Sequence, residues 1–193
     1  MKSRKDIKYG NIMEVATSEV VTIPPTSTIM SALKTMVTYR FRRIPVADAG
    51  SKRLLGLLVA MDLIDFFGGG RKHGIVLKHN GNLIIAVNEE VEEIMEKDVV
   101  TVDISDSWMD GLEVMLDKDV SSCTIIDGER VAGIITERDM LELLTLKNEH
   151  VLKRPYVFDS VATDVGSIMT RSVVSAEPAT SIGKAMETMI SRR

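Results

Sequence analysis

Hydrophobic and polar residues follow a pattern along this chain that occurs three times. Each occurrence begins with Ile-Met, continues to a Val-Val pair and a turn rich in Pro, Ser, Thr or Asp, and ends in a helical pattern. The three segments start at Ile12, Ile94 and Ile168. Self-similarity of this kind indicates a repeat architecture, in which each copy is one structural unit.

Apolar residues recur at helical spacing in the first two copies. In the first copy the stripe follows Ser27 or Thr28, either of which suits the N-cap position. Its members are Ile29, Ala32, Leu33, Met36 and Val37. The second copy has the same stripe, made by Trp108, Leu112, Met115 and Leu116. We therefore expect one helix in each copy, with this face turned toward a core.

Two short buried strands and a second helix should follow in each of these copies. The strands of the first copy are predicted over residues 43–48 and 53–59, around a turn at Ala49-Gly50. Those of the second copy are predicted over 124–127 and 130–136, around Asp127-Gly128. The closing helices should span 61–67, where the glycines at 68–70 stop the helix, and 137–146. With the Val-Val strand, the unit reads strand, helix, strand, strand, helix, which is an α+β arrangement.

The units should depend on one another. A unit of about 50 residues buries too little apolar surface alone, so copies one and two should pair through their small sheets. The third copy stops at the point aligned with Arg40, so we expect a truncated third unit and a longer parent chain. The predicted segments are a basic N-terminal segment 1–10, a first unit 11–70, a connecting segment 71–90, a second unit 91–147, a connecting segment 148–166 and the start of a third unit 167–193.

Composition narrows the classes of protein. The chain has 193 residues, 45% of them hydrophobic and 27% charged, which is typical of a globular protein. No apolar run approaches the roughly 18 residues of a membrane span, and the basic N-terminus leads into no signal sequence. The single cysteine, Cys123, excludes an internal disulfide, and we expect a cytoplasmic location. A net charge of -4, with acids and bases mixed, makes nucleic acid an unlikely partner.

Several stretches resemble one known family. They are VVTIPPTSTIMSALKTM, FRRIPV and GLLVAMD in the first copy, and VVTV, TIID and GIITERD in the second. The unit resembles the cystathionine beta-synthase (CBS) domain, which occurs in tandem pairs called Bateman modules. The layout is similar to archaeal proteins with four such domains, which resemble the gamma subunit of AMP-activated protein kinase. The resemblance implies an energy-sensing regulatory module without catalysis, which binds AMP, ADP or ATP between paired domains.

Thr136 and Asp139 stand three residues apart in GIITERD, where a helix is predicted to begin. One interpretation is a capping box that only stabilises the helix. The resemblance implies instead that the two oxygens of Asp139 accept both ribose hydroxyls, with Thr136 near the α-phosphate. The first copy keeps Asp62 but has Val59 in place of the threonine. This favours the ligand role, because a capping box that lost its hydroxyl has little reason to keep its acid.

Arg42 and Arg43 precede the first buried strand of copy one, where copy two has Ser121 and Ser122. Two arginines there can form a solvated edge. The resemblance implies contacts to phosphate, which the planar guanidinium groups suit. Other site residues that the resemblance implies are Thr22, Ile44, Val100, Thr101, Val102, Ser122, Thr124 and Arg138. For Thr22 and Thr101, ordinary strand propensity is the alternative.

Alternative functions stay open at this point. One is a dimerising interaction scaffold with vestigial clefts, and another is an S-adenosylmethionine sensor. No nucleophile, general base or phosphate loop is visible, so we expect neither an enzyme nor a cofactor. The histidines lack metal-ligand spacing, so we expect no metal. A homodimer through the domain helices is expected, because Met30 and Leu33 are apolar positions left over from the core.

Overall fold

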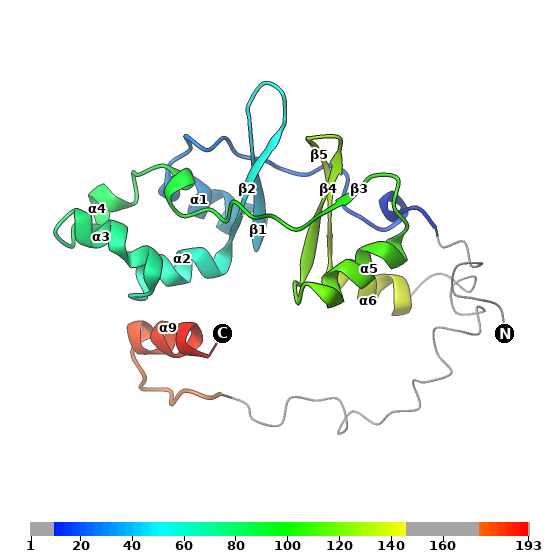
Figure 1. The fold of residues 1–193 in the computed structure, drawn as a ribbon. Helices are drawn as coiled ribbons and strands as arrows, with labels where there is room; N and C mark the ends of the chain where they lie inside the picture. Colours follow the sequence, from blue (N-terminus) through cyan, green and yellow to red (C-terminus); the bar gives the residue numbers. More distant parts are fainter. Residues whose placement is uncertain (1–9, 146–173, 193) are drawn as a thin grey trace.

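The computed structural model describes residues 10–145 and 174–192, which form two similar repeats and one further helix (Figure 1). The first repeat consists of α1 (Ile29–Tyr39), β1 (Arg43–Ala47), β2 (Leu54–Val59) and α2 (Ala60–Phe67). The second repeat consists of β3 (Thr101–Asp103), α5 (Trp108–Asp117), β4 (Ser122–Asp127), β5 (Arg130–Thr136) and α6 (Glu137–Thr145). Shorter elements are η2 (Ile12–Glu14), η3 (Arg71–His73), α3 (Gly74–Lys78), α4 (Leu83–Ala86) and η4 (Val91–Glu93), and the further helix is α9 (Ile182–Ser191).

Both repeats contain an antiparallel hairpin with the same register. Arg43 lies opposite Val59 in β1 and β2, as Ser122 lies opposite Thr136 in β4 and β5. In the second repeat, β3 adds a parallel strand beside β4. In the first repeat the strand predicted around the Val-Val pair is reduced to one bridge at Ile23. Two prolines follow Ile23 directly, and proline has no N–H to extend a ladder.

The predicted helix faces are correct except at their last members. Thr28 is the N-cap of α1, because its Oγ1 accepts a hydrogen bond of 3.1 Å from the Ser31 N–H. Met36 is buried as expected, but Val37 is 71% exposed. The prediction for Leu116 is wrong in the same way, since its exposed fraction is 73%. The reason is rotation: one residue further along lies about 100° further around the helix, outside the buried stripe.

Each repeat completes its core with residues that precede the other repeat. We call residues 12–22 and 91–100 the first and second crossing segments; Figure 1 shows both running between the repeats. Ile12 is fully buried in the core of the second repeat, beside Ile125 and Ile135. Ile94 and Met95 are buried in the core of the first repeat. The Ile-Met pair that opens each of the first two copies therefore packs on the core of the other.

Backbone hydrogen bonds fix the crossing segments in place. Thr17 exchanges two hydrogen bonds of 3.1 Å with Ile134 of β5. Glu96 exchanges two of 2.8 Å with Leu57 of β2. The hairpin turns also meet, because the Leu54 N–H donates to the Glu129 carbonyl at 2.8 Å. These contacts confirm that the repeats pair through their small sheets.

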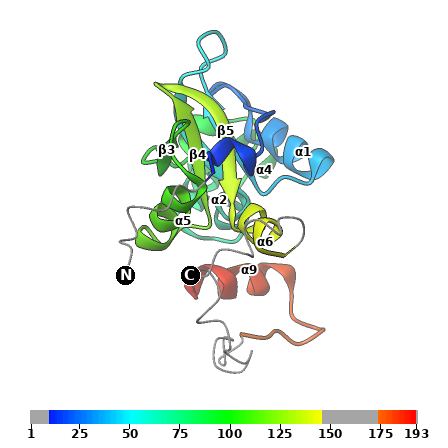
Figure 2. The same ribbon diagram turned by 90° about the vertical axis from the view of Figure 1, so that its right-hand side faces the viewer.

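The remaining segments pack on the first repeat. Four residues of the segment between the repeats enter its core, namely Ile75, Val76, Ala86 and Val87. Helix α9, from the third copy, contacts α2 and lies beneath the two repeats in both views (Figures 1 and 2). Gly68 allows this approach, since a Cβ there would lie 2.7 Å from Met186 Cβ. Met30 and Leu33 are partly buried against the core, and the homodimer expected through them stays a prediction.

Replacing Gly56 with Ala should lower the free energy of unfolding by about 1–3 kcal/mol. The new Cβ would lie 2.5 Å from Met95 Sδ and 2.8 Å from the Glu96 carbonyl oxygen, so the second crossing segment would have to move. Gly74→Ala is the control, because a Cβ there meets nothing within 4 Å. Urea denaturation of both variants measures the difference. Equal stability of the two variants would contradict this account of the crossing.

Candidate functional site

A pocket of about 310 Å³ lies where the two repeats meet the first crossing segment. The first repeat contributes Arg40, Phe41, Arg42 and Arg43. The second contributes Ile134, Thr136, Arg138 and Asp139, and the crossing segment contributes Thr17, Glu19, Val20 and Val21. The arginines of copy one and the complete GIITERD motif of copy two therefore lie in the same pocket. Each copy supplies what the other lacks.

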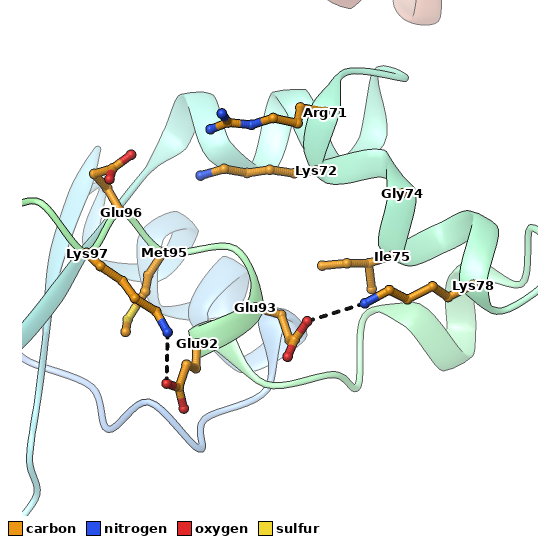
Figure 3. Close-up of a pocket in the computed structure, with 10 residues that line it drawn as sticks. All are labelled: Arg71, Lys72, Gly74, Ile75, Lys78, Glu92, Glu93, Met95, Glu96 and Lys97. Carbon is orange, nitrogen blue, oxygen red and sulfur yellow. Dashed lines mark hydrogen bonds and ion pairs between the residues drawn. The ribbon is translucent and has the colours of Figure 1, made fainter.

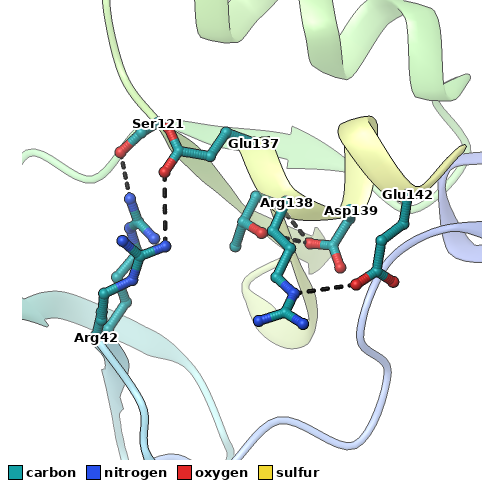
Figure 4. Close-up of polar contacts among 8 residues, drawn as sticks. Arg42, Ser121, Glu137, Arg138, Asp139 and Glu142 are labelled. Atoms are coloured by element: carbon teal, nitrogen blue, oxygen red, sulfur yellow. Dashed lines mark hydrogen bonds and ion pairs between the residues drawn. The ribbon is translucent and has the colours of Figure 1, made fainter. Parts of the chain in front are cut away.

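The end of α1 directs the arginines to the pocket. Arg40 has a left-handed backbone, with φ 58°, which ends the helix and turns the chain toward β1. Arg42 forms an ion pair of 3.6 Å with Glu137, the first residue of α6 (Figure 4). Arg43 donates a hydrogen bond to the Ser121 hydroxyl of the second repeat. Both arginines thus contact the second repeat, so the pocket wall spans the two repeats.

The surroundings of Arg43 affect the pKa of its guanidinium in both directions, and the net effect is a lowering. The pKa of its guanidinium is lowered chiefly by burial, and the neighbouring Arg42 lowers it further. Glu137 and Asp139 act in the opposite direction. A guanidinium stays charged under these influences, because its pKa starts far above neutrality. The pocket therefore holds partly desolvated positive charge next to carboxylates, which suits a ligand with both anionic and hydrogen-bond donor groups.

Asp139 uses one of its two carboxylate oxygens to cap α6. Its Oδ2 accepts hydrogen bonds of 2.7 Å from the N–H and from the hydroxyl of Thr136. The Asp139 half of the predicted capping box is therefore present, whereas the Thr136 hydroxyl donates to the carboxylate and is not seen accepting from a backbone N–H of α6 among the described residues. No donor from the described residues reaches Oδ1. Capping leaves one oxygen of a pocket-lining carboxylate free to accept from a ligand.

Asp62 occupies the equivalent position in the first repeat but has both oxygens engaged. Its Oδ2 accepts a hydrogen bond of 2.8 Å from the Val59 N–H. Its Oδ1 lies 2.5 Å from Lys72 Nζ, which also donates to the Ile94 carbonyl. Asp62 is only 3% exposed. Asp62 and Asp139 hold equivalent positions in the repeat, but their carboxylates have different hydrogen-bond partners.

Lys72 also lines a wider pocket of about 540 Å³ between α3 and the second crossing segment (Figure 3). Two ion pairs join four of its other charged groups, Lys78 with Glu93 at 3.6 Å and Lys97 with Glu92 at 3.1 Å, while Arg71 and Glu96 add one charge of each sign. These pairs are largely exposed and contribute little stability. Because the charges of this pocket largely neutralise one another, it offers a charged ligand no clear preference.

The other predicted site residues lie outside the 310 Å³ pocket. Ile44 and Val102 are buried in the cores of the two repeats. The remaining ones are buried or half-buried away from it: Thr22, Val100, Thr101, Ser122 and Thr124. Sequence reasoning missed Thr17, Glu19, Val21, Arg40, Phe41 and Ile134 as pocket residues. Arg40 and Phe41 adjoin the predicted arginines in sequence and could have been included. Thr17 lines the pocket because the first crossing segment pairs with Ile134 of β5, which the sequence does not show.

Cys123 behaves as a small hydrophobic residue. It is fully buried in β4, and burial raises the pKa of its thiol to about 11. A thiol of this kind is a poor nucleophile at neutral pH. Within the described residues, no group of His, Cys, Asp and Glu is arranged to hold a metal ion. No helix in the described part of the chain has the length and apolar character needed to span a bilayer.

These features define a class of protein. The CBS domain family model matches residues 12–69, 91–146 and 165–193, so the chain belongs to the CBS domain family. The tandem α+β architecture expected from the sequence is thereby confirmed, and the family model also matches the third copy over residues 165–193.

Among individual relatives, protein MJ1225 of Methanocaldococcus jannaschii is 34% identical over 186 residues. Its crystal structure, of a protein proposed as an archaeal homolog of g-AMPK, superposes with a TM-score of 0.81 at 32% identity and covers 94% of this chain. A 33.4 kDa protein of Thermofilum pendens is 29% identical over 173 residues. The chain spans 62% and 53% of the lengths of these two relatives.

Solved structures of other CBS proteins show the same fold at lower identity. CBSX2 in complex with AMP has a TM-score of 0.56 and 16% identity, covering 70% of this chain and 96% of that one. The CBS domain pair of MJ0100, in complex with 5-methylthioadenosine and S-adenosyl-L-methionine, has a TM-score of 0.55 and 20% identity, covering 71% of this chain and 97% of that one. At these identities the likeness concerns the fold alone.

Lys72→Met should destabilise the protein by about 3 kcal/mol or more, because it leaves the Asp62 carboxylate buried without its partner. The side chains of the pair are only 13% and 5% exposed. Lys78→Met is the matched control, since the Lys78 side chain is 68% exposed in its ion pair with Glu93. Thermal unfolding of both variants at pH 7 measures the difference. Similar melting temperatures would show that the Lys72–Asp62 pair is not a structural ion pair.

Proposed function

We propose that this chain is a regulatory module that binds an adenine nucleotide in the 310 Å³ pocket between its repeats. The observation that carries the proposal is the meeting of Arg40, Arg42, Arg43 and Arg138 with Asp139 in one pocket. A nucleotide presents the complementary groups, namely a phosphate for the arginines and a vicinal diol for the free carboxylate oxygen. The N-terminus of α6 beside them adds a partial positive charge that suits a phosphate.

The roles of the residues follow from their positions. Asp139 Oδ1 accepts hydrogen bonds from the ribose hydroxyls, while Oδ2 stays bound to Thr136. Arg42 and Arg43 face the phosphate from the first repeat. Val20, Val21 and Ile134 supply the apolar surface on which an adenine ring packs. Binding then joins the two repeats and the crossing segment through one ligand, which is how occupancy can be transmitted to a partner protein.

Charge favours a phosphate-bearing ligand over S-adenosylmethionine. The pocket lining has more arginines than carboxylates, and only Glu19 and Asp139 are acidic. The sulfonium of S-adenosylmethionine is a cation and would meet the guanidinium groups with like charge. AMP, ADP and ATP instead bring negative charge to the same place. We therefore place the adenine nucleotides ahead of S-adenosylmethionine, although structures of other CBS proteins hold ligands of both kinds.

Asp139→Asn should weaken AMP binding about ten- to a hundred-fold, because it removes one charge-assisted hydrogen bond. Asp110→Asn is a matched control, since Asp110 caps α5 in the same way: its Oδ2 accepts from the Ser107 N–H at 2.9 Å and from its hydroxyl at 2.6 Å. Both variants should lose similar stability, but only the first should lose affinity. Calorimetric titration with AMP measures the affinity. Unchanged affinity in both variants would favour the interaction scaffold over the nucleotide sensor.

Arg42→Gln and Glu137→Gln should change nucleotide affinity in opposite directions. The first variant removes a charge that we assign to phosphate binding. The second removes the carboxylate that lies 3.6 Å from Arg42 and would compete with phosphate for it. We expect affinity for ATP to fall severalfold in the first variant and rise in the second, with a smaller change for adenosine. Titrations at two salt concentrations check the electrostatic origin. Changes of the same sign would exclude this role of the ion pair.

A further inference from the structure

We propose that Lys72 is an internal substitute for a ligand at Asp62, so that the two repeats bind one nucleotide and not two. This inference rests on the proposed function and concerns the second position that the repeat creates. It follows from three observations: the equivalence of the two acids, the engagement of Asp62, and the side chains that surround the second position.

The backbone makes the two positions equivalent. Asp62 follows Val59 by three residues at the β2–α2 junction, as Asp139 follows Thr136 at the β5–α6 junction. The paired residues on the neighbouring strands also correspond, because Arg43 opposes Val59 and Ser122 opposes Thr136. Each hairpin receives the same bridge from a crossing segment. The backbone alone therefore gives no reason for a ligand to bind at one of these positions and not at the other.

The side chain of Lys72 takes the ligand's place in one of them. The Lys72 ammonium donates to Asp62 Oδ1, the oxygen that corresponds to the free one of Asp139, and to the Ile94 carbonyl. An ammonium has donors to offer a carboxylate, as a ribose diol has. A neutral diol cannot replace a buried cation without leaving an uncompensated charge, which is costly. The residue ten positions after Asp139 is Glu149, which has no ammonium to play this part.

The second position also lacks counterparts of the arginines that line the first. Arg40, Arg42, Arg43 and Arg138 correspond there to Asp119, Ser121, Ser122 and Met61. Ser121 already accepts the hydrogen bond from Arg43 and so supports the first position. Glu96 and Asp98 precede the Val-Val pair on this side, where the first crossing segment has Thr17 and Glu19. The neighbouring 540 Å³ pocket has basic and acidic side chains in near balance, because Lys78 and Lys97 are paired with Glu93 and Glu92, so it offers a phosphate no cluster of unpaired arginines like that of the first position.

Calorimetric titration with adenosine, the diol without phosphate, counts the sites directly. We expect one adenosine per chain in the wild-type protein and none in Asp139→Asn. Two adenosines in the wild type, or a remaining site in Asp139→Asn that disappears on further replacement of Asp62 by Asn, would overturn the inference while leaving the proposed function standing. Absence of adenosine and AMP binding to the wild type would overturn the proposed function, and this inference with it.

The double variant Asp139→Asn, Lys72→Ala tests the part played by Lys72. Freed from the ammonium, Asp62 should recover adenosine binding that the single variant Asp139→Asn lacks, with affinity at least tenfold above its background. Circular dichroism establishes that the variant is folded. A folded double variant without adenosine binding would show that Lys72 is not what closes the position. If the double variant does not fold, the number of adenosine sites in the wild type and in Asp139→Asn still decides whether the two repeats bind one nucleotide or two.

Discussion

The structure depends on the exchange of the crossing segments between the repeats. Ile12 and Ile94 are both almost fully inaccessible, and each is buried in the core of the repeat that it does not begin. Removing either residue would leave a cavity in the opposite repeat, which costs several kcal/mol. Two units that are individually small therefore stabilise one another, as the surface-to-volume argument requires. The same exchange brings Thr17 to the edge of β5, where it becomes part of the pocket wall.

Duplication gives the two repeats one backbone plan, and their side chains then differ. The Val59–Asp62 and Thr136–Asp139 pairs have the same geometry at the start of a helix. The Asp62 carboxylate has both oxygens engaged, one of them in an ion pair with Lys72, whereas Asp139 Oδ1 can still accept a hydrogen bond from a ligand. The arginines of the first repeat and the motif of the second converge on Asp139. A duplicated fold thereby contains a structural position and a binding position built from the same parts.

The sequence predicted the main helices and both hairpins and part of the pocket, because these depend on local patterns, but it also predicted a strand at the first Val-Val pair that is reduced to one bridge. Helical spacing identified Ile29 and Met36 as core residues, and the Thr136–Asp139 spacing located the start of a helix. The repeat identifies Ile12 as the start of the first copy but does not show which core it enters, so the crossing of the segments could not be predicted. Lys72 belongs to no motif, and only the three-dimensional structure brings it to Asp62, ten residues away.

A structure determined with AMP bound would test the central claim most directly. The account predicts one nucleotide in the pocket between Arg42 and Asp139, with a ribose hydroxyl about 2.7 Å from Asp139 Oδ1. It also predicts that Lys72 stays on Asp62 in the same crystal. A nucleotide bound at Asp62 with Lys72 displaced, or a ribose held away from Asp139, would contradict it.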